Sequence, residues 1–255
     1  MRVRATTATS VVAAAAAGAL AFSVFAAPAA YAAKDNLSIS DVVANGGRSI
    51  VVGTTAKKSF TVTATVTEDS GVKEADLAIE HDDPHYNYYW KPATCKSAGK
   101  SRYSCKATLT IDPRAEWFRN EQAGTWKVHA QASGKDGDVY GDYYSTVPVK
   151  RAAELTVDAA PEPVKKGRTL TVTGKLTRAD WNTNKYANYA SQPVRLEFRK
   201  KDSSAYSTVK TVKANGSGSL KTTVKAVSDG YWRWNFTGTS TTAAIATTGD
   251  YVDVR

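Results

Sequence analysis

Five acidic side chains in the first half of the chain offer the oxygen ligands that calcium prefers. They stand in or just after two predicted turns, at positions Glu68, Asp69, Asp136, Asp138 and Asp142. The turns emerge at the same end if the segments before them are the second and sixth strands of a β-sandwich. Ca²⁺ takes about six to eight oxygens from carboxylates, backbone carbonyls and water, so that end suits a calcium site. The spacing does not match an EF-hand loop, and Asp-Gly is ordinary hairpin chemistry, so plain turns are the favoured alternative.

Basic side chains are concentrated in the second half of the chain. The sequence has 34 lysines and arginines against 24 aspartates and glutamates, a formal net charge of +10. Residues 33–154 hold 16 basic and 16 acidic side chains, whereas residues 155–255 hold 16 basic and 8 acidic ones. Such a bias is typical of domains that meet polyanions, although charge can also serve only to keep a secreted domain soluble.

Four cations of the second half occupy alternate positions that point outward from predicted strands: Arg195, Arg199, Lys221 and Lys225. They predict a basic sheet face that grips phosphates or carboxylates. Outside a cell the matching partners include wall teichoic acids, acidic polysaccharides, anionic lipid and released DNA. No nucleic-acid-binding motif accompanies these residues, so sequence-specific binding of DNA or RNA is not expected.

Aromatic side chains interleaved with amides form a loop-like cluster in the early part of the second half. Trp181, Tyr186 and Tyr189 stand among three asparagines, and a second aromatic run occupies residues 86–90. Flat rings beside amides suit stacking on sugars, so the first cluster predicts a carbohydrate-recognition module as the alternative function. Aromatic side chains also close the ends of β-sandwiches, which is the competing interpretation.

The two cysteines, Cys95 and Cys105, predict a disulfide bond. An export signal, described below, indicates an oxidising compartment in which pairing is the default. Residues 98–101 read as a turn between them, and Cys105 shares parity with Leu109, so it faces the core side of its strand. The bridge would therefore staple a hairpin, and a redox or metal-binding pair is the disfavoured alternative.

The sequence contains no recognisable catalytic motif. It contains three histidines and neither a nucleophile elbow, a phosphate-binding loop nor a zinc-protease motif. Residues 81–85 (HDDPH) match a zinc cluster only loosely, and a polar loop is the better interpretation. We therefore expect no enzyme, and calcium is the one candidate cofactor.

Short segments in which apolar and polar side chains alternate, each bounded by turns, predict an all-β protein. Residues 60–67 alternate apolar side chains with threonines, and Asn-Gly or Asp-Gly turns recur at short intervals. The pattern at residues 61–67 returns at residues 171–177, and the segment around Trp126 returns around Trp232. A period of about one hundred residues indicates one small domain duplicated. Two runs of about seven short strands indicate immunoglobulin-like sandwiches with these tryptophans in their cores.

The chain begins with an export signal. Arg2 and Arg4 precede an Ala-rich apolar run at residues 11–27, and residues 30–32 offer small side chains at a cleavage-type spacing. We expect cleavage after Ala32 and a mature protein that is secreted, extracellular or cell-wall associated. A membrane anchor is the weaker alternative, because the run is short and ends in a cleavage triplet, so no membrane span is expected.

Several stretches of the chain resemble a family of exported actinobacterial two-domain immunoglobulin-like proteins. They lie at residues 45–55, 68–72, 161–167 and 249–255, and the likeness spans nearly the whole mature chain. Members of that family are often labelled calcium-binding or uncharacterised. The resemblance therefore implies a two-sandwich fold and supplies no catalytic residues.

These observations predict a signal peptide at residues 1–32, an Ig-like β-sandwich with one disulfide at residues 33–151 and a basic Ig-like β-sandwich at residues 152–255. The expected function is that of a non-catalytic binding or structural protein. It would attach to an anionic cell-wall or extracellular polymer, or to a surface protein. Calcium binding by the first domain is a further hypothesis.

Overall fold

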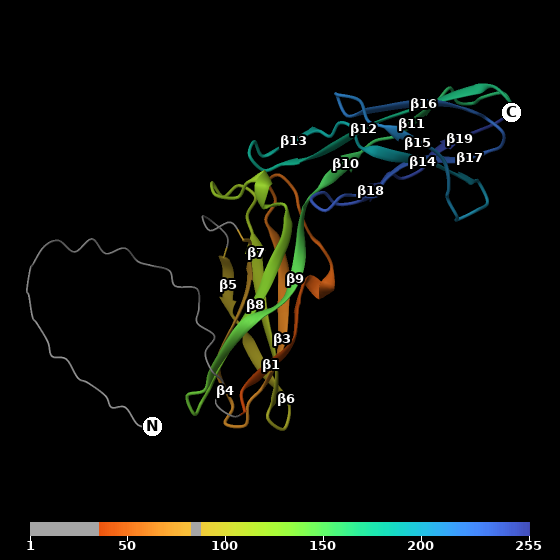
Figure 1. The fold of residues 1–255 in the computed structure, drawn as a ribbon. Coiled ribbons are helices and arrows are strands. Elements are labelled where there is room, and N and C mark those ends of the chain that lie inside the picture. Colours follow the sequence, from red (N-terminus) through yellow and green to blue (C-terminus); the bar gives the residue numbers. More distant parts are fainter. Residues whose placement is uncertain (1–35, 83–87) are drawn as a thin grey trace, which may run out of the picture.

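The computed structural model describes residues 36–82 and 88–255. The predicted signal peptide at residues 1–32 lies outside the described residues, and so do residues 83–85 of the HDDPH segment. The described chain folds into two β-sandwiches that meet at a bend (Figure 1). The predicted class, all-β with two tandem immunoglobulin-like sandwiches, is confirmed.

The first sandwich packs a four-stranded sheet of order β1-β3-β7-β6 against a five-stranded sheet of order β2-β9-β8-β4-β5. Neighbouring strands are antiparallel except β2, which runs parallel to β9. Its elements are β1 (Ser38–Ala44), η1 (Asn45–Gly47), β2 (Ile50–Val52), β3 (Lys58–Thr67), β4 (Val72–Glu80), β5 (Tyr88–Pro92), β6 (Thr94–Gly99), β7 (Arg102–Ile111), η2 (Asn120–Gln122), β8 (Gly124–Gly134) and β9 (Val139–Arg151). Within the described residues, no helix is long and apolar enough to cross a membrane.

Strand β3 shows why this sequence forms a sheet with one buried face. Phe60, Val62 and Ala64 are buried and alternate with threonines that keep partial exposure. Strand β7 pairs with β3 along its whole length and buries Ala107 and Leu109 on the same side. Because successive side chains of a strand point to opposite faces, this alternation places one apolar face on the core. The predicted period of two is confirmed here.

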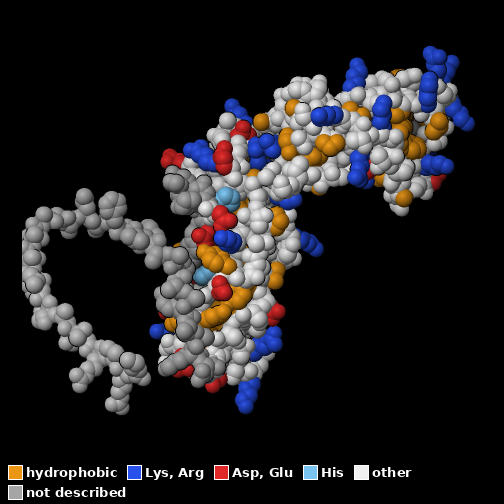
Figure 2. All heavy atoms as spheres, viewed as in Figure 1, with side chains coloured by type: hydrophobic (Ala, Val, Ile, Leu, Met, Phe, Trp, Pro, Cys, Tyr) orange, Lys and Arg blue, Asp and Glu red, His pale blue; other side chains and the backbone are white. Residues whose placement is uncertain are grey.

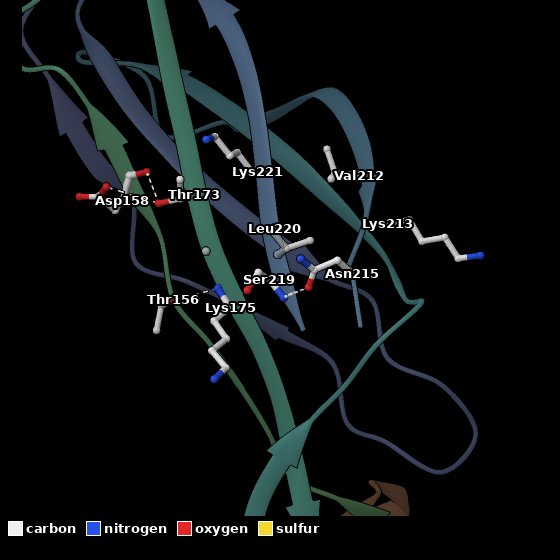
Figure 3. A pocket seen from close by; sticks show the side chains of 11 residues that line it. Thr156, Asp158, Thr173, Lys175, Val212, Lys213, Asn215, Ser219, Leu220 and Lys221 are labelled. Carbon is white, nitrogen blue, oxygen red and sulfur yellow. Dashed lines mark hydrogen bonds between the residues drawn. The ribbon is translucent and has the colours of Figure 1, made fainter. Parts of the chain in front are cut away.

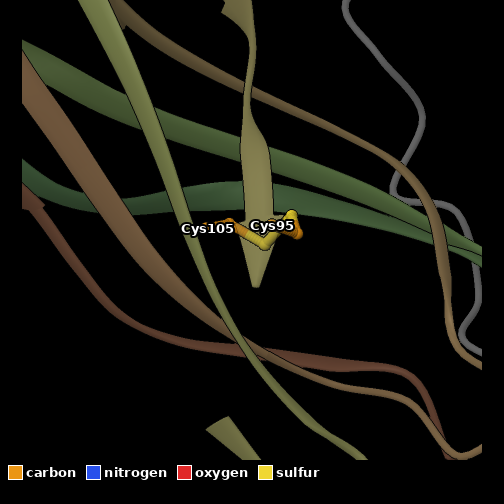
Figure 4. The surroundings of a disulfide bond; sticks show 2 residues. All are labelled: Cys95 and Cys105. Carbon is orange, nitrogen blue, oxygen red and sulfur yellow. A yellow bond between two sulfur atoms is a disulfide. The ribbon is translucent and has the colours of Figure 1, made fainter. Parts of the chain in front are cut away.

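A disulfide fastens the edge of the four-stranded sheet. Cys95 in β6 and Cys105 in β7 are direct cross-strand partners, and their sulfurs are bonded (Figure 4). The Cys105 side chain is fully buried, so it points into the core as its parity predicts. The predicted bridge and the hairpin that it staples are both confirmed.

The second sandwich is built from two layers. In the first layer, β12 pairs with β10, β11, β13 and β16; the second layer has the order β15-β14-β17-β18, with β19 also paired to β17. Its elements are β10 (Ala153–Leu155), β11 (Asp158–Ala160), β12 (Thr169–Asp180), β13 (Lys185–Asn188), β14 (Pro193–Lys200), β15 (Ser207–Lys213), β16 (Ser219–Lys225), β17 (Gly230–Phe236), β18 (Ile245–Ala246) and β19 (Asp250–Val252).

Matching tryptophans occupy the two hydrophobic cores. Trp126 in β8 is 0% exposed, and Trp232 in β17 is 5% exposed. Each belongs to a separate cluster of buried apolar side chains, one for each sandwich. The prediction that these tryptophans fill the cores is therefore confirmed.

The junction between the sandwiches is short and hydrogen-bonded. Strand β9 ends at Arg151 and β10 begins at Ala153, so a single residue separates the last strand of one sandwich from the first strand of the next. The backbone N–H of Arg151 donates to the Thr241 carbonyl at 3.0 Å, which ties the end of β9 to the second sandwich. The junction is thus built into the sheets of both sandwiches.

Candidate functional site

Three of the five predicted calcium ligands meet at one end of the first sandwich. Glu68 and Asp69 follow β3, and Asp136 lies in the turn between β8 and β9. Ligand atoms of the three carboxylates all lie within 4.8 Å of one another. The N–H of Lys135 donates to the Gly71 carbonyl at 2.9 Å and so links the two turns. Both turns therefore emerge at the same end, as the sequence indicates.

Glu68 is the unusual member of this acidic group. Its side chain is 0% exposed. One carboxylate oxygen, Oε1, accepts hydrogen bonds from the Ser70 N–H at 2.9 Å and the Ser70 hydroxyl at 2.8 Å. The other oxygen, Oε2, is buried and has no hydrogen-bond partner. A buried carboxylate oxygen without a partner is costly, so this atom requires an explanation.

Gly134 packs tightly against the acidic group. A Cβ atom at this position would lie 2.6 Å from Oδ1 of Asp136 and 2.9 Å from Oε2 of Glu68. Any other residue would therefore crowd both carboxylates. The absence of a side chain lets the carboxylates of Glu68 and Asp136 approach the same stretch of backbone, and carboxylate oxygens gathered in this way are the ligand type that Ca²⁺ takes.

Asp138 and Asp142 are not part of the acidic group, so the prediction is wrong for these two residues. Asp142 lies within β9 and pairs with Ala130, which carries it along the sheet and away from the turn. Asp138 is 6% exposed, and its backbone N–H donates to Oδ1 of Asp136 at 3.2 Å. It thus helps to form the turn and does not contribute its carboxylate to the group.

Trp181, predicted to contact sugars, instead joins the two sandwiches. Its side chain is 1% exposed and belongs to the hydrophobic core of the first sandwich. The indole N–H donates to the carbonyls of Val52 at 3.3 Å and Gly53 at 3.0 Å. The ring packs against Phe118, with centroids 4.4 Å apart. Because a ring enclosed in this way cannot stack on a sugar, the prediction of an exposed Trp181 is wrong.

Polar side chains close the junction around this tryptophan. Asn120 accepts a hydrogen bond from the Trp181 backbone N–H at 2.9 Å and donates its side-chain N–H to Asp180 at 2.9 Å. The Asn120 backbone N–H donates to the Asn182 side chain at 2.9 Å. The hydrogen bond from Asn120 lowers the pKa of Asp180 below its usual range. The end of β12 is therefore fixed to the first sandwich by both apolar and polar contacts.

The two tyrosines of the predicted glycan site are also part of the packed structure. Tyr189 is 8% exposed, and the guanidinium of Arg178 lies 4.1 Å from its ring centroid. Tyr186 is half-buried and packs against the core of the first sandwich. The predicted exposed aromatic cluster is therefore not formed, because its rings seal the junction and one end of the second sandwich.

The burial of Trp181 has a signal in the sequence: the buried apolar residues change from even to odd positions toward the end of β12. Leu170, Val172 and Leu176 occupy even positions and face the core of the second sandwich, whereas Ala179 and Trp181 occupy odd positions. A strand that shifts its apolar positions by one presents its other face for burial. The first sandwich covers that other face only at the end of β12, at Ala179, and at Trp181, which follows the strand.

The four predicted polyanion-binding cations do not form one face. Arg195 and Arg199 lie on β14, whereas Lys221 and Lys225 lie on β16, and these strands belong to different layers of the second sandwich. Outward side chains of two packed layers point in opposite directions. The prediction of a single basic face is therefore wrong, and each layer carries cations of its own.

We define a lysine face as Lys175, Lys221 and Lys225 of the layer that contains β12 and β16, together with Lys213 at the end of β15, an edge strand of the other layer. All four side chains are exposed. A hollow of about 580 Å³ opens beside them, lined by three of these lysines and by one acidic residue, Asp158 (Figure 3). In Figure 3 the ammonium ends point in different directions around the hollow and do not converge on one point.

The opposite layer presents an Arg–Tyr face, which we define as Arg199, Arg233, Tyr206, Tyr231 and Tyr251. The guanidinium of Arg199 lies 3.7 Å from the Tyr231 ring centroid and 5.4 Å from that of Tyr206. The guanidinium of Arg233 lies 3.7 Å from the Tyr206 centroid. The rings of Tyr231 and Tyr251 are 5.1 Å apart. Cations and rings thus alternate along this face in cation–π geometry.

A buried carboxylate anchors the Arg–Tyr face. Glu197 is 6% exposed and accepts hydrogen bonds from Arg233 Nε at 2.7 Å and Asn235 Nδ2 at 2.8 Å. Arg199 donates instead to two backbone carbonyls, those of Lys201 at 3.4 Å and Ser203 at 2.8 Å. Arg199 therefore has no carboxylate partner among the residues that the structure describes.

Most cations of the second sandwich have no ion-pair partner. Residues 155–255, all of which the structure describes, hold 16 basic side chains, and only Arg233 and Arg255 lie within 4 Å of a carboxylate. In Figure 2 lysines and arginines dominate the visible face of the second sandwich, whereas acidic and basic side chains mix on the first. The uncompensated charge seen in the sequence is therefore displayed on the surface of one sandwich.

Comparisons with solved structures return other proteins at low similarity. Fibronectin(III)-like modules of CbhA from Clostridium thermocellum share 17% identity, cover 86% of this chain and 92% of theirs, and give a TM-score of 0.35. The D00-D0 domain of intimin shares 16% identity over 85% of this chain and 98% of its own, with a TM-score of 0.26. The adhesin InvE of Yersinia pseudotuberculosis shares 15% identity over 85% of this chain and 60% of its own, with a TM-score of 0.28. TM-scores this low support no conclusion about function.

Neither a protein-family model nor a curated protein matches this chain. The resemblance to exported actinobacterial proteins therefore stays a prediction.

Proposed function

We propose that this is a non-catalytic binding or structural protein that acts outside the cell, and that its second sandwich holds an anionic polymer at a cell surface or in the extracellular space. One observation supports this most: the second sandwich carries 16 basic against 8 acidic side chains, and only two of the cations form ion pairs with carboxylates that the structure describes. Positive potential of this kind attracts polyanions. Charge that served solubility alone would have no reason to be confined to one of two related domains.

The lysine face suits a polymer better than a single small anion. The ammonium groups of Lys175, Lys213 and Lys221 diverge around the hollow in Figure 3, so they do not converge on one small ligand. A polymer with repeated charges can engage them one after another. Each contact releases counterions, which makes such binding strong at low salt and weak at high salt.

Titration calorimetry on the mature chain, residues 33–255, tests this proposal with polyphosphate, polygalacturonate and neutral dextran. We expect both polyanions to bind and dextran not to bind. Replacing the four lysines of the lysine face by glutamine should weaken both interactions at least tenfold, since each lost contact removes a favourable charge interaction.

A matched control removes the same number of charges from the first sandwich. It replaces four exposed lysines there by glutamine: Lys91, Lys96, Lys100 and Lys106. This variant should bind both polyanions like the wild type. The proposal would be contradicted if the wild type bound neither polyanion. It would also be contradicted if both quadruple variants lost the same amount of affinity.

A second candidate function is calcium binding by Glu68, Asp69 and Asp136. It is favoured by the buried Oε2 of Glu68, which has no hydrogen-bond partner among the described residues and lies in the same cluster as Asp69 and Asp136. A cation there would compensate the cost of burying that oxygen. The three carboxylates supply part of a calcium coordination shell, and backbone carbonyls and water would supply the rest.

Melting curves with calcium, with magnesium and with a chelator test this second candidate. Calcium at about one hundred times its Kd should stabilise the fold by about 2.7 kcal/mol and raise the melting temperature. Glu68→Gln should abolish that rise, whereas Asp142→Asn, outside the acidic group, should keep it. Equal melting temperatures with calcium and chelator, or an unchanged rise in Glu68→Gln, would contradict calcium binding here.

A further inference from the structure

We infer that the Arg–Tyr face binds the sugar units of an acidic polysaccharide, with the tyrosine rings contacting the sugar and the guanidinium groups contacting its carboxylates. This inference rests on the proposed function, because it names the class of anionic polymer that the second sandwich holds. It assigns recognition to β14, β17 and β19, whereas the lysine face supplies only charge.

The register of the strands brings this face together. Arg199 on β14 pairs with Tyr231 on β17, and Tyr231 pairs with Tyr251 on β19, so the three side chains form one row across the sheet. Glu197 pairs with Arg233 in the next row of the same face. Side chains directly opposite each other on neighbouring strands lie on the same side of a sheet. The rings and guanidiniums are therefore fixed in line by backbone pairing.

Hydrogen bonds and stacking hold the face in position before any ligand arrives. Glu197 fixes Arg233 through a 2.7 Å contact, and Arg233 in turn lies over one face of the Tyr206 ring. The Ser203 carbonyl fixes Arg199 at 2.8 Å, and Arg199 lies over one face of the Tyr231 ring. Because these side chains are ordered already, a ligand would lose little entropy in ordering them, which favours binding.

The chemistry of the face matches a sugar that carries a negative charge. Guanidinium groups bind carboxylates in a planar, often bidentate geometry that ammonium groups cannot reproduce. Tyrosine offers a flat apolar ring together with a hydroxyl, which suits a sugar with one apolar face and several hydroxyls. A polyphosphate chain has charge but no ring to contact, and neutral dextran has rings but no charge. The two properties of the face occur together in a polyuronate.

A charge-preserving double variant tests this inference. Arg199→Lys keeps the positive charge but loses the planar group, and Tyr231→Leu keeps an apolar side chain but loses the ring. We expect polygalacturonate binding to weaken about tenfold or more, whereas polyphosphate binding stays within about twofold of wild type. Arg195→Lys is the matched control, because Arg195 lies outward on the same strand and is not part of the Arg–Tyr face. It should leave both affinities unchanged.

Circular dichroism and melting curves establish that the variants are folded, and Tyr251→Leu replaces Tyr231→Leu if the latter is not. If the folded double variant binds polygalacturonate like the wild type, while the variant of the lysine face loses both polyanions, the inference is wrong and the proposed function stands. If wild-type protein binds polyphosphate and polygalacturonate equally and the double variant loses both equally, the Arg–Tyr face acts only through charge and the inference is wrong. If wild-type protein binds neither polymer, the proposed function itself fails.

Discussion

Replacing Trp181 by alanine removes a fully buried ring that packs across the junction between the two sandwiches. Truncating a buried tryptophan costs about 3–5 kcal/mol, because apolar surface is lost and a cavity remains. The carbonyls of Val52 and Gly53 also lose the indole donor, at about 1 kcal/mol for a hydrogen bond of this kind. We therefore expect Trp181→Ala to lower the free energy of unfolding of the first sandwich by about 4 kcal/mol.

Urea denaturation followed by circular dichroism measures this loss. With a dependence on urea of about 3 kcal/mol per molar, the midpoint should fall by about 1.3 M. Trp90→Ala is the matched control, since the Trp90 side chain is 52% exposed. A surface truncation of this kind should change the free energy of unfolding by no more than about 0.5 kcal/mol.

Small-angle scattering adds an independent measurement of the junction. Loss of the Trp181 ring should loosen the contact with Phe118 and increase the radius of gyration. The reasoning would be refuted if Trp181→Ala and Trp90→Ala shifted the urea midpoint equally, because the ring would then contribute no more than an exposed side chain.

Two further predictions concern the first sandwich. Replacing Cys95 and Cys105 by serine should lower the free energy of unfolding by about 2–3 kcal/mol, because the bridge closes a short loop; thermal denaturation measures this, and a loss near zero would contradict it. Burial lowers the pKa of His129 below its ordinary 6.5, so the unfolded chain binds this proton first as the pH falls. The contribution of His129 to stability is complete above about pH 6.5 and declines as the pH drops toward the lower folded-state pKa. His129→Gln should flatten the stability profile between pH 7 and about pH 5, and an unchanged profile would show that other groups cause it.

Features that depend on a single strand or a single hairpin were predictable from the sequence. The alternation around Phe60 identifies the buried face of β3, and the parity of Cys105 places it in the core. Trp126 could be assigned to the core because a matching tryptophan recurs in the second unit. The meeting of Glu68 with Asp136 also followed, since the turns after β3 and β8 lie at the same end.

Features that depend on which strands pair were not predictable in the same way. Alternation places Arg195 and Lys221 outward from their strands, but it does not say that β14 and β16 lie in opposite layers. The burial of Trp181 required knowledge that a second domain covers the end of β12, although the change from even to odd buried positions signals it. The stack of Arg199 on Tyr231 depends on the register between β14 and β17, which periodicity alone does not fix.

We propose that the uncompensated positive charge of the second sandwich binds an anionic polymer. The most direct test measures the affinity of the mature chain for polygalacturonate over a range of salt concentrations. If about four cations contact the polymer, the logarithm of the binding constant should fall with the logarithm of salt concentration at a slope of roughly −3. The quadruple variant of the lysine face should give a shallower slope. Absence of binding at low salt, or an affinity that does not change with salt, would contradict the account.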